Sequence, residues 1–297
     1  MNPGDFILRL LFLVQTGIGV VGNSFLLSIY APTSCTGRVP RPTHLILTHM
    51  AVANFLVLLF KGIPHMMLIW GITPTLGNAG CKLVYYIHRV ARGLSLCTTC
   101  LLSNFQAITI SPRPGGMIGL NHQAWKSISF SCVLCWIFNL LMNIFIPINM
   151  EGLQHGHNST KLLDYGLCSS RDSETSTIRY TFLMTLADVV FLALMAGASA
   201  YMVLLLHTHQ QTVKHIYSTN KSHRFSPETK ATQTILILAS TFIVFYLTNS
   251  FLTIYSTLIL KSRLWLQHTN AFLAACYSTI SPLILMLRDP RTSNCCS

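Results

Sequence analysis

Seven long apolar stretches alternate with short polar connections along this chain of 297 residues. An α-helix needs about 20 residues to cross about 30 Å of hydrocarbon, and every stretch is at least that long. Because the stretches take up most of the chain, the pattern predicts an all-α membrane protein in which a single domain, residues 1–297, forms a seven-transmembrane helix bundle. The stretches cover residues 6–30, 44–70, 81–110, 125–149, 180–206, 231–260 and 264–287.

The composition supports a membrane location. Charged residues make up only 9% of the chain, against about 25% in soluble domains. The net charge of +12 arises mainly from Lys and Arg in the short connections, where these residues orient a membrane protein. No Gly-rich phosphate loop or aromatic RNA-binding motif accompanies them, so nucleic acid is not an expected partner.

The basic residues favour an extracellular N-terminus and a cytoplasmic C-terminus, since Lys and Arg concentrate on the inner side of membrane proteins. In that orientation the inner side holds ten of the 20 Lys and Arg residues, the outer side seven and the spans three. Two N-glycosylation sequences conflict, because the Asn-Ser-Thr sequence at Asn158 then lies outside and the Asn-Lys-Ser sequence at Asn220 inside. We expect a glycan at Asn158.

The positions of the cysteines agree with this orientation. Cys81 opens the third stretch and Cys168 precedes the fifth, so both lie on the outer side. An oxidising exterior favours a disulfide between Cys81 and Cys168. At the cytoplasmic C-terminus, Cys295 and Cys296 are either palmitoylation sites or exposed free thiols.

Several sequence strings, taken together, resemble the vomeronasal type 1 receptors. The likeness covers nearly the whole chain, with the strings in the same order and on the expected spans. The strings include Tyr86–Arg92 (YIHRVAR), Leu94–Gln106 (LSLCTTCLLSNFQ), Ser226–Leu236 (SPETKATQTIL) and Ser281–Leu285 (SPLIL).

This resemblance implies a rhodopsin-like receptor in the plasma membrane. Such a receptor binds a small chemosensory or pheromone-like molecule from the outer side, within the helix bundle. It activates a heterotrimeric G protein, of the inhibitory class, at the inner face, and it needs no cofactor.

The chain departs from the wider rhodopsin-like class at three positions that matter for activation. Gln106 stands where that class has the Arg of its Asp-Arg-Tyr motif, Asn54 replaces the acidic residue of the second span, and Ser281–Leu285 lacks the usual following Tyr. These replacements remove an ion-paired lock and a sodium site. The activation switch of the wider class therefore cannot be transferred to this chain.

Three ionisable residues within the spans are the candidate ligand-binding residues: Arg89, Arg92 and Asp188. Ionisable groups inside a membrane are costly and face the bundle interior. The two arginines share a face of the third span, about 12 and 17 Å below Cys81, and Asp188 lies about 12 Å into the fifth. Two interpretations remain open: an Arg–Asp ion pair that fixes helix packing, or an Arg that meets a carboxylate, sulfate or carbonyl group of the ligand.

Two neighbouring cationic residues have structural interpretations. We expect His88 to serve in helix packing or at the lipid boundary. We expect the side chain of Lys61 to extend to the outer headgroups.

On the inner side, the resemblance implies G-protein contacts at Gln106, Lys214, Lys221, Arg224 and Lys230. The basic residues of this connection also favour attraction to anionic membrane lipids, at about 1 kcal/mol for each residue. The two interpretations are compatible.

Other classes of function find little support in the sequence. The pairs Cys97/Cys100 and Cys132/Cys135 have CxxC spacing, but they lie in apolar spans, where packing explains small residues better than zinc, so no metal is expected. No motif of a hydrolase or nucleotide-binding enzyme is present, so an enzyme is not expected. A seven-helix transporter or channel is the alternative function, but it calls for polar residues along several spans, and Asp188 is the only acidic residue in the apolar stretches.

Overall fold

The structure is a computed structural model that describes residues 3–31, 42–72, 77–111, 120–152, 168–170, 174–216, 227–258 and 264–288. Within these residues, seven helical segments are long and apolar enough to cross a membrane, which confirms the predicted fold class. The helices are α1 (Pro3–Tyr30), α2 (Pro42–Val57), η2 (Leu58–Gly62), α3 (Ile63–Ile69), α4 (Asn78–Ile110), α5 (Leu120–Met142), α6 (Phe145–Asn149), α7 (Glu174–Ile216), α8 (Pro227–Leu258) and α9 (Leu264–Arg288).

The second span is built from three consecutive helical pieces. A π-helical turn, η2, joins α2 to α3, and Pro64 stands in the first turn of α3. Proline lacks an N–H and its ring crowds the preceding turn, so a wider π-turn lets the helix continue past it. The π-turn contains Lys61, and His65 follows in α3.

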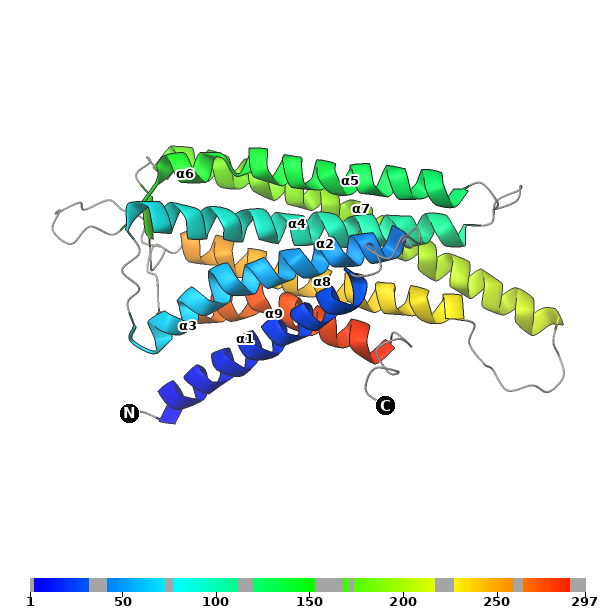
Figure 1. Cartoon of the computed structure of the whole chain (residues 1–297), viewed down its shortest axis with the longest axis horizontal. Helices are drawn as coiled ribbons and strands as arrows, with labels where there is room; N and C mark the ends of the chain where they lie inside the picture. Colours follow the sequence, from blue (N-terminus) through cyan, green and yellow to red (C-terminus); the bar gives the residue numbers. More distant parts are fainter. Residues whose placement is uncertain are drawn as a thin grey trace.

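Helix α4 is the central helix of the bundle, in contact with α2, α5, α7 and α8 (Figure 1). Its middle third carries hydroxyl residues that would be costly inside a membrane unless their hydroxyl groups were bonded. The two threonines return hydrogen bonds to the preceding turn: Thr98 donates to Leu94 O at 2.8 Å, and Thr99 donates to Ser95 O at 2.7 Å. The same pattern continues from Ser103 to Thr99 O at 3.0 Å.

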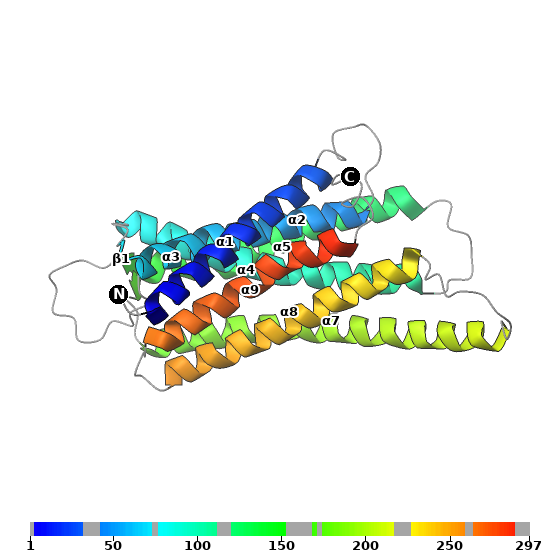
Figure 2. The same ribbon diagram turned by 90° about the horizontal axis from the view of Figure 1, so that it is seen from below.

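The other helices surround α4. Helix α1 packs on α2 and α9, and α8 packs on α9 and α7. The last turns of α7 project beyond the rest of the bundle (Figure 2). The start of α1 lies at the end of the bundle that carries the β-hairpin, and α9 ends toward the opposite end (Figure 1).

A buried polar network joins four helices below the centre of the bundle. The amide of Asn54, which has no exposed surface, donates to Ser281 Oγ at 2.9 Å and accepts from Ser95 Oγ at 2.7 Å and Ser278 Oγ at 3.3 Å. Asn23 on α1 donates to the backbone oxygen of Ser278 at 2.8 Å. The neutral Asn54 therefore fulfils a structural role where the wider class has an acid.

A short antiparallel hairpin caps one end of the bundle, a feature that the hydrophobic pattern did not predict. Strand β1 (Met150–Gly152) pairs with β2 (Cys168–Ser170), with Met150 opposite Ser170 and Gly152 opposite Cys168. Cys81, at the start of α4, is disulfide-bonded. The side chain of Cys168 lies outside the described residues, so its pairing with Cys81 stays a prediction, although β1 contacts α4.

Large apolar side chains cover the outside of the bundle. Phe182 is 70% exposed and Phe251 is 68% exposed. In water such a surface would be unfavourable, but in a bilayer these side chains contact lipid. They are therefore excluded as lining residues of an internal pocket.

Candidate functional site

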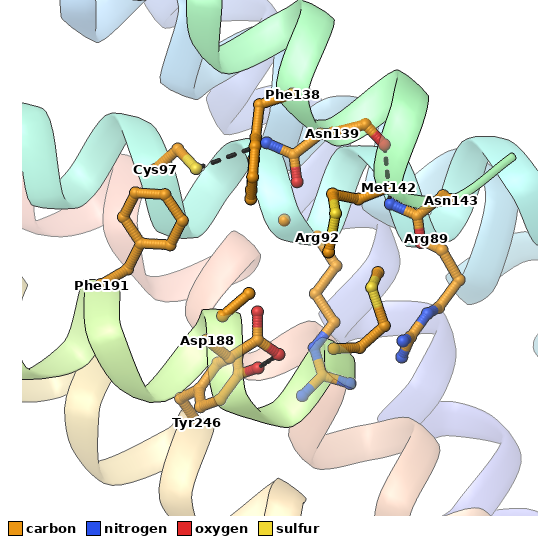
Figure 3. A pocket seen from close by; sticks show the side chains of 13 residues that line it. Arg89, Arg92, Cys97, Phe138, Asn139, Met142, Asn143, Asp188, Phe191 and Tyr246 are labelled. Carbon is orange, nitrogen blue, oxygen red and sulfur yellow. Dashed lines mark hydrogen bonds between the residues drawn. The ribbon is translucent and has the colours of Figure 1, made fainter. Parts of the chain in front are cut away.

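The three candidate ligand-binding residues converge on one pocket. Arg89 and Arg92 come from α4 and Asp188 from α7, and α5 and α8 complete the walls (Figure 3). The pocket is lined by Arg89, Arg92, Gly93, Cys97, Phe138, Asn139, Met142, Asn143, Met184, Ala187, Asp188, Phe191 and Tyr246.

Tyr246 on α8 connects the acid to one of the arginines. Its hydroxyl group donates a hydrogen bond to Asp188 Oδ2, and the guanidinium carbon of Arg92 lies 4.7 Å from the centre of its ring (Figure 3). A cation over the face of an aromatic ring is attracted by the ring's negative face. Among the described side chains, the link between Arg92 and Asp188 thus runs through Tyr246 and is not the direct ion pair that one interpretation of the sequence required.

Arg92 has a second polar neighbour on α8. With the amide of Asn249 oriented to satisfy its surroundings, the amide oxygen accepts from Arg92 Nη2 at 3.3 Å. In the same orientation the amide nitrogen donates to the backbone oxygen of Asn270, on α9, at 3.0 Å. Arg92 therefore contacts α8 at two points, through Tyr246 and Asn249.

Arg89 interacts electrostatically with Tyr180 on the other side of the pocket. The hydroxyl group of Tyr180 donates a hydrogen bond to Asn143 Oδ1 at 3.0 Å. Asn143 donates to the backbone oxygen of Asn139 at 2.8 Å, and Phe145 stacks on Tyr180 with ring centres 4.8 Å apart. The two arginines, three residues apart on one helix, therefore face different partners.

The wall between α4 and α5 is formed by Asn139 packed against glycine and thiol groups. Asn139 Nδ2 donates to Cys135 O at 2.8 Å and to Cys97 Sγ at 3.3 Å. Gly93 makes room for this amide, because a Cβ at residue 93 would lie 1.9 Å from Asn139 Oδ1. Cys97 and Cys135 are free thiols, and no group of three or more potential metal ligands occurs among the described residues.

The charge of the pocket is unbalanced. Two guanidinium groups and one carboxylate line it, so the lining carries a net positive charge. Each guanidinium has five N–H donors and no acceptor, and those not used by neighbouring side chains can serve a ligand. The arrangement favours a guest that carries a negative charge or a strong hydrogen-bond acceptor.

The structure describes the two neighbouring basic residues, His88 and Lys61. His88 is buried and packs against Tyr85, with ring centres 6.5 Å apart, which excludes the lipid boundary. Half-buried Lys61 interacts electrostatically with Arg92, His65 and His88. Lys61 therefore lies within electrostatic range of the bundle interior, and the extension of its side chain to the outer headgroups stays a prediction.

At the far end of α4, Gln106 is buried and donates to Thr232 Oγ1 on α8 at 3.4 Å. A G protein could reach this side chain only after α8 has moved. Lys230 is exposed, and Lys214 lies in α7, its side chain outside the description. The other residues assigned from the sequence also lie outside the described residues: Lys221, Arg224, Asn158, Cys295 and Cys296.

Sequence reasoning found the charged residues of this pocket and missed its neutral ones. Tyr246, Asn139 and Asn143 carry no charge, so nothing distinguished them from other residues of their spans. One signal was available: a Tyr hydroxyl or an Asn amide deep in an apolar span must find a hydrogen-bond partner.

Comparison with known proteins agrees with this geometry. The model of the vomeronasal organ pheromone receptor family matches residues 6–297. The chain is similar to human vomeronasal type-1 receptor 3, at 43% identity over 100% of this chain and 96% of the relative. It is also similar to gorilla vomeronasal type-1 receptor 1, at 40% identity over 96% and 81%, and to zebrafish olfactory receptor class A-like protein 1, at 28% over 93% and 87%.

These matches cover all seven spans and concern receptors, not enzymes or transporters. The seven spans and the receptor family together indicate a multi-pass protein of the plasma membrane. A receptor of this kind has a ligand and couples to a G protein. The chain belongs to the vomeronasal type 1 receptor family, whose members are chemosensory G-protein-coupled receptors.

Proposed function

We propose that this receptor binds a small pheromone-like molecule in the pocket of Arg89, Arg92 and Asp188 and activates a heterotrimeric G protein of the inhibitory class. The observation that carries the proposal is the convergence of these three side chains from two helices on one pocket. Ionisable side chains inside a membrane are retained where they serve a function. The ligand enters from the outer side, at the end where Cys81 and the hairpin lie.

The chemistry of the pocket defines the polar part of the ligand. A carboxylate, sulfate or carbonyl group fits the guanidinium of Arg92, which pairs with such groups in two parallel hydrogen bonds. On α8 the described partners of Arg92 are an aromatic face and a neutral amide. Both contacts are weaker than a bidentate pair between a guanidinium and an anionic group, so a ligand that carries such a group can replace them.

Signalling then follows from a shift between two conformations of the bundle. The ligand favours the conformation to which it binds more tightly, by the difference between its two binding free energies. By reciprocity, a G protein bound at the inner face must tighten ligand binding at the outer pocket. Helix α8 is the moving element in this proposal, because it carries Tyr246 at the pocket and Thr232 beside Gln106.

The orientation and the remaining sites complete the proposal. The N-terminus is extracellular and the C-terminus cytoplasmic, which places a Cys81–Cys168 disulfide and a glycan at Asn158 outside. On the inner side, Gln106 and the basic residues contact the G protein, and the tail is palmitoylated. The residues concerned on the inner side are Lys214, Lys221, Arg224, Lys230, Cys295 and Cys296.

The test measures ligand-promoted nucleotide exchange on an inhibitory-class G protein, using a panel of odorants and steroids that includes carboxylates and sulfates. Arg92→Ala should reduce the response to an active compound far more than it reduces surface expression, and Arg92→Lys should restore part of it, since lysine keeps the charge but loses the bidentate geometry. Equal loss of response and expression would leave Arg92 with a structural role only. Solute flux in receptor-containing vesicles would support a transporter instead.

A further inference from the structure

A second pocket lies beside the proposed ligand site, between α2, α4, α8 and α9. Its walls are mainly apolar and include the aromatic rings of Phe242, Phe245 and Tyr277. Ser95 and Ser278 supply hydroxyl groups on its polar side. It contains none of the residues that the sequence marked as ligand contacts, apart from Arg92.

Arg92 and Tyr246 line both pockets. The guanidinium of Arg92 lies over the ring of Tyr246. The hydroxyl group of Tyr246 donates a hydrogen bond to Asp188, which fixes the position of the ring. Phe242 stacks on Tyr246 with ring centres 5.6 Å apart and an angle of 17° between the rings. Arg92 and Tyr246 therefore form the wall that the two pockets share.

We infer that the Arg92–Tyr246 pair is a movable partition, and that the second pocket is a subsite for an uncharged, mainly apolar ring of the ligand. The inference rests on the proposed function, in which the ligand's acceptor group binds Arg92. When Arg92 turns toward that acceptor it leaves the face of Tyr246, and the two pockets become one. The ligand then places its polar end among the arginines and its apolar ring against Phe242, Phe245 and Tyr277.

The second pocket also reaches the buried network around Asn54. The hydroxyl groups of Ser95 and Ser278, which line the pocket, both donate to Asn54 Oδ1, at 2.7 and 3.3 Å. Asn54 in turn donates to Ser281. A ring that enters this pocket therefore contacts side chains that hold α2, α4 and α9 together. The apolar part of the ligand can thus affect the packing of these three helices, whereas its polar part, in the first pocket, does not reach this network.

The test needs no ligand, because it measures access to the second pocket through the partition. Ala274 lines the second pocket and Ala187 the first. Each is replaced by cysteine in a receptor held in lipid nanodiscs, and the anionic reagent 2-sulfonatoethyl methanethiosulfonate is added. Mass spectrometry with fragmentation of the peptide localises each modification to a single residue and gives its rate, which separates residue 274 from the native Cys276 two positions away.

Removal of the partition should accelerate only the cysteine behind it. We expect Tyr246→Ala to raise the rate at Ala274→Cys by roughly tenfold, the effect of losing one cation–π contact that keeps the wall closed. Tyr246→Phe should leave the rate near the native value, since the ring still closes the wall. The rate at Ala187→Cys should be the same with Tyr246 and with Tyr246→Ala.

Two results would overturn the inference. One is an unchanged rate at Ala274→Cys when the Tyr246 ring is removed, which would mean that the pair does not separate the pockets. The other is an equal acceleration at both cysteines, which would mean that the bundle has merely loosened. Tyr246→Leu repeats the measurement if Tyr246→Ala does not fold, and neither result bears on G-protein coupling, which the nucleotide-exchange assay tests separately.

Discussion

Gly93 is the position where one added methyl group should disturb the ligand pocket most directly. The three heavy atoms nearest to a Cβ at residue 93 all belong to Asn139, with Oδ1 at 1.9 Å and Cγ at 3.0 Å. Asn139 is 4% exposed and is held by hydrogen bonds to Cys135 O and Cys97 Sγ. Gly93→Ala must therefore break these bonds or push α5 away from α4.

The magnitude follows from opposing contributions. Alanine favours the helix over glycine by about 1 kcal/mol. Overpacking a buried contact costs about 1–3 kcal/mol, and leaving a buried amide unsatisfied costs about 1–3 kcal/mol more. The unfavourable contributions exceed the favourable one, so we expect Gly93→Ala to lower the free energy of unfolding by about 1–5 kcal/mol.

The assay is thermal unfolding of the purified receptor in detergent, arranged as a double-mutant cycle with Asn139→Ala. Once the Asn139 amide is gone, the methyl group at residue 93 meets no nearby atom, and the substitution should be neutral or stabilising by up to about 1 kcal/mol. Gly197→Ala on α7 is the matched control, because nothing lies within 4 Å of its Cβ. An equal loss of stability with and without the Asn139 amide would refute the reasoning.

Three further predictions concern other parts of the bundle. Asn54→Leu should lower the free energy of unfolding by about 1–3 kcal/mol, because it leaves buried serine hydroxyl groups unpaired, whereas Ser24→Ala on the exposed face should have little effect in the same thermal assay; similar melting temperatures would contradict this. Gln106→Leu should raise basal nucleotide exchange by about 2–10-fold, the value of one net hydrogen bond, and adding Thr232→Val should raise it no further; additive effects would show that the pair does not act together. Cys81→Ser should cost about 2–4 kcal/mol of stability and should make the melting temperature insensitive to reducing agent, a result that an unchanged sensitivity would contradict.

Hydropathy predicted the seven spans well because each helix in a bilayer must bond its own backbone and present apolar side chains to lipid. Hydropathy marks only the part of a helix that lies in the membrane, so it did not predict how far a helix continues beyond its apolar stretch. Helix α7 extends over Glu174–Ile216, past the predicted 180–206 at both ends. The β-hairpin also escaped prediction, since three-residue strands carry no detectable period.

The sequence predicted the charged residues of the site but not the neutral ones. Arg89, Arg92 and Asp188 stood out because charges in hydrocarbon need a partner, and helix rise placed them at a common depth. Their actual partners could not be predicted, because the rotation of α8 about its axis is fixed by packing against α4, α7 and α9 rather than by its own sequence. This packing determines that Tyr246 faces the pocket.

In the proposed function, the contacts between α4 and α8 are the means by which the pocket acts on the opposite end of the bundle. Arg92 meets Tyr246 toward the end of the bundle that carries the β-hairpin, and Gln106 meets Thr232 toward the opposite end. Fourteen residues separate the two contacts on each helix, or about 21 Å at 1.5 Å per residue.

The two helices run in opposite directions. The Arg92–Tyr246 and Gln106–Thr232 contacts can therefore both form only in one relative position of α4 and α8. At 3.4 Å the Gln106–Thr232 hydrogen bond is near the limit of such bonds and is weak on its own. When Arg92 leaves Tyr246, only the weak Gln106–Thr232 hydrogen bond remains of these two contacts between α4 and α8. In the proposed function, a ligand that competes for the Arg92 guanidinium group would release the opposite end of α8 without breaking an ion pair among the described residues.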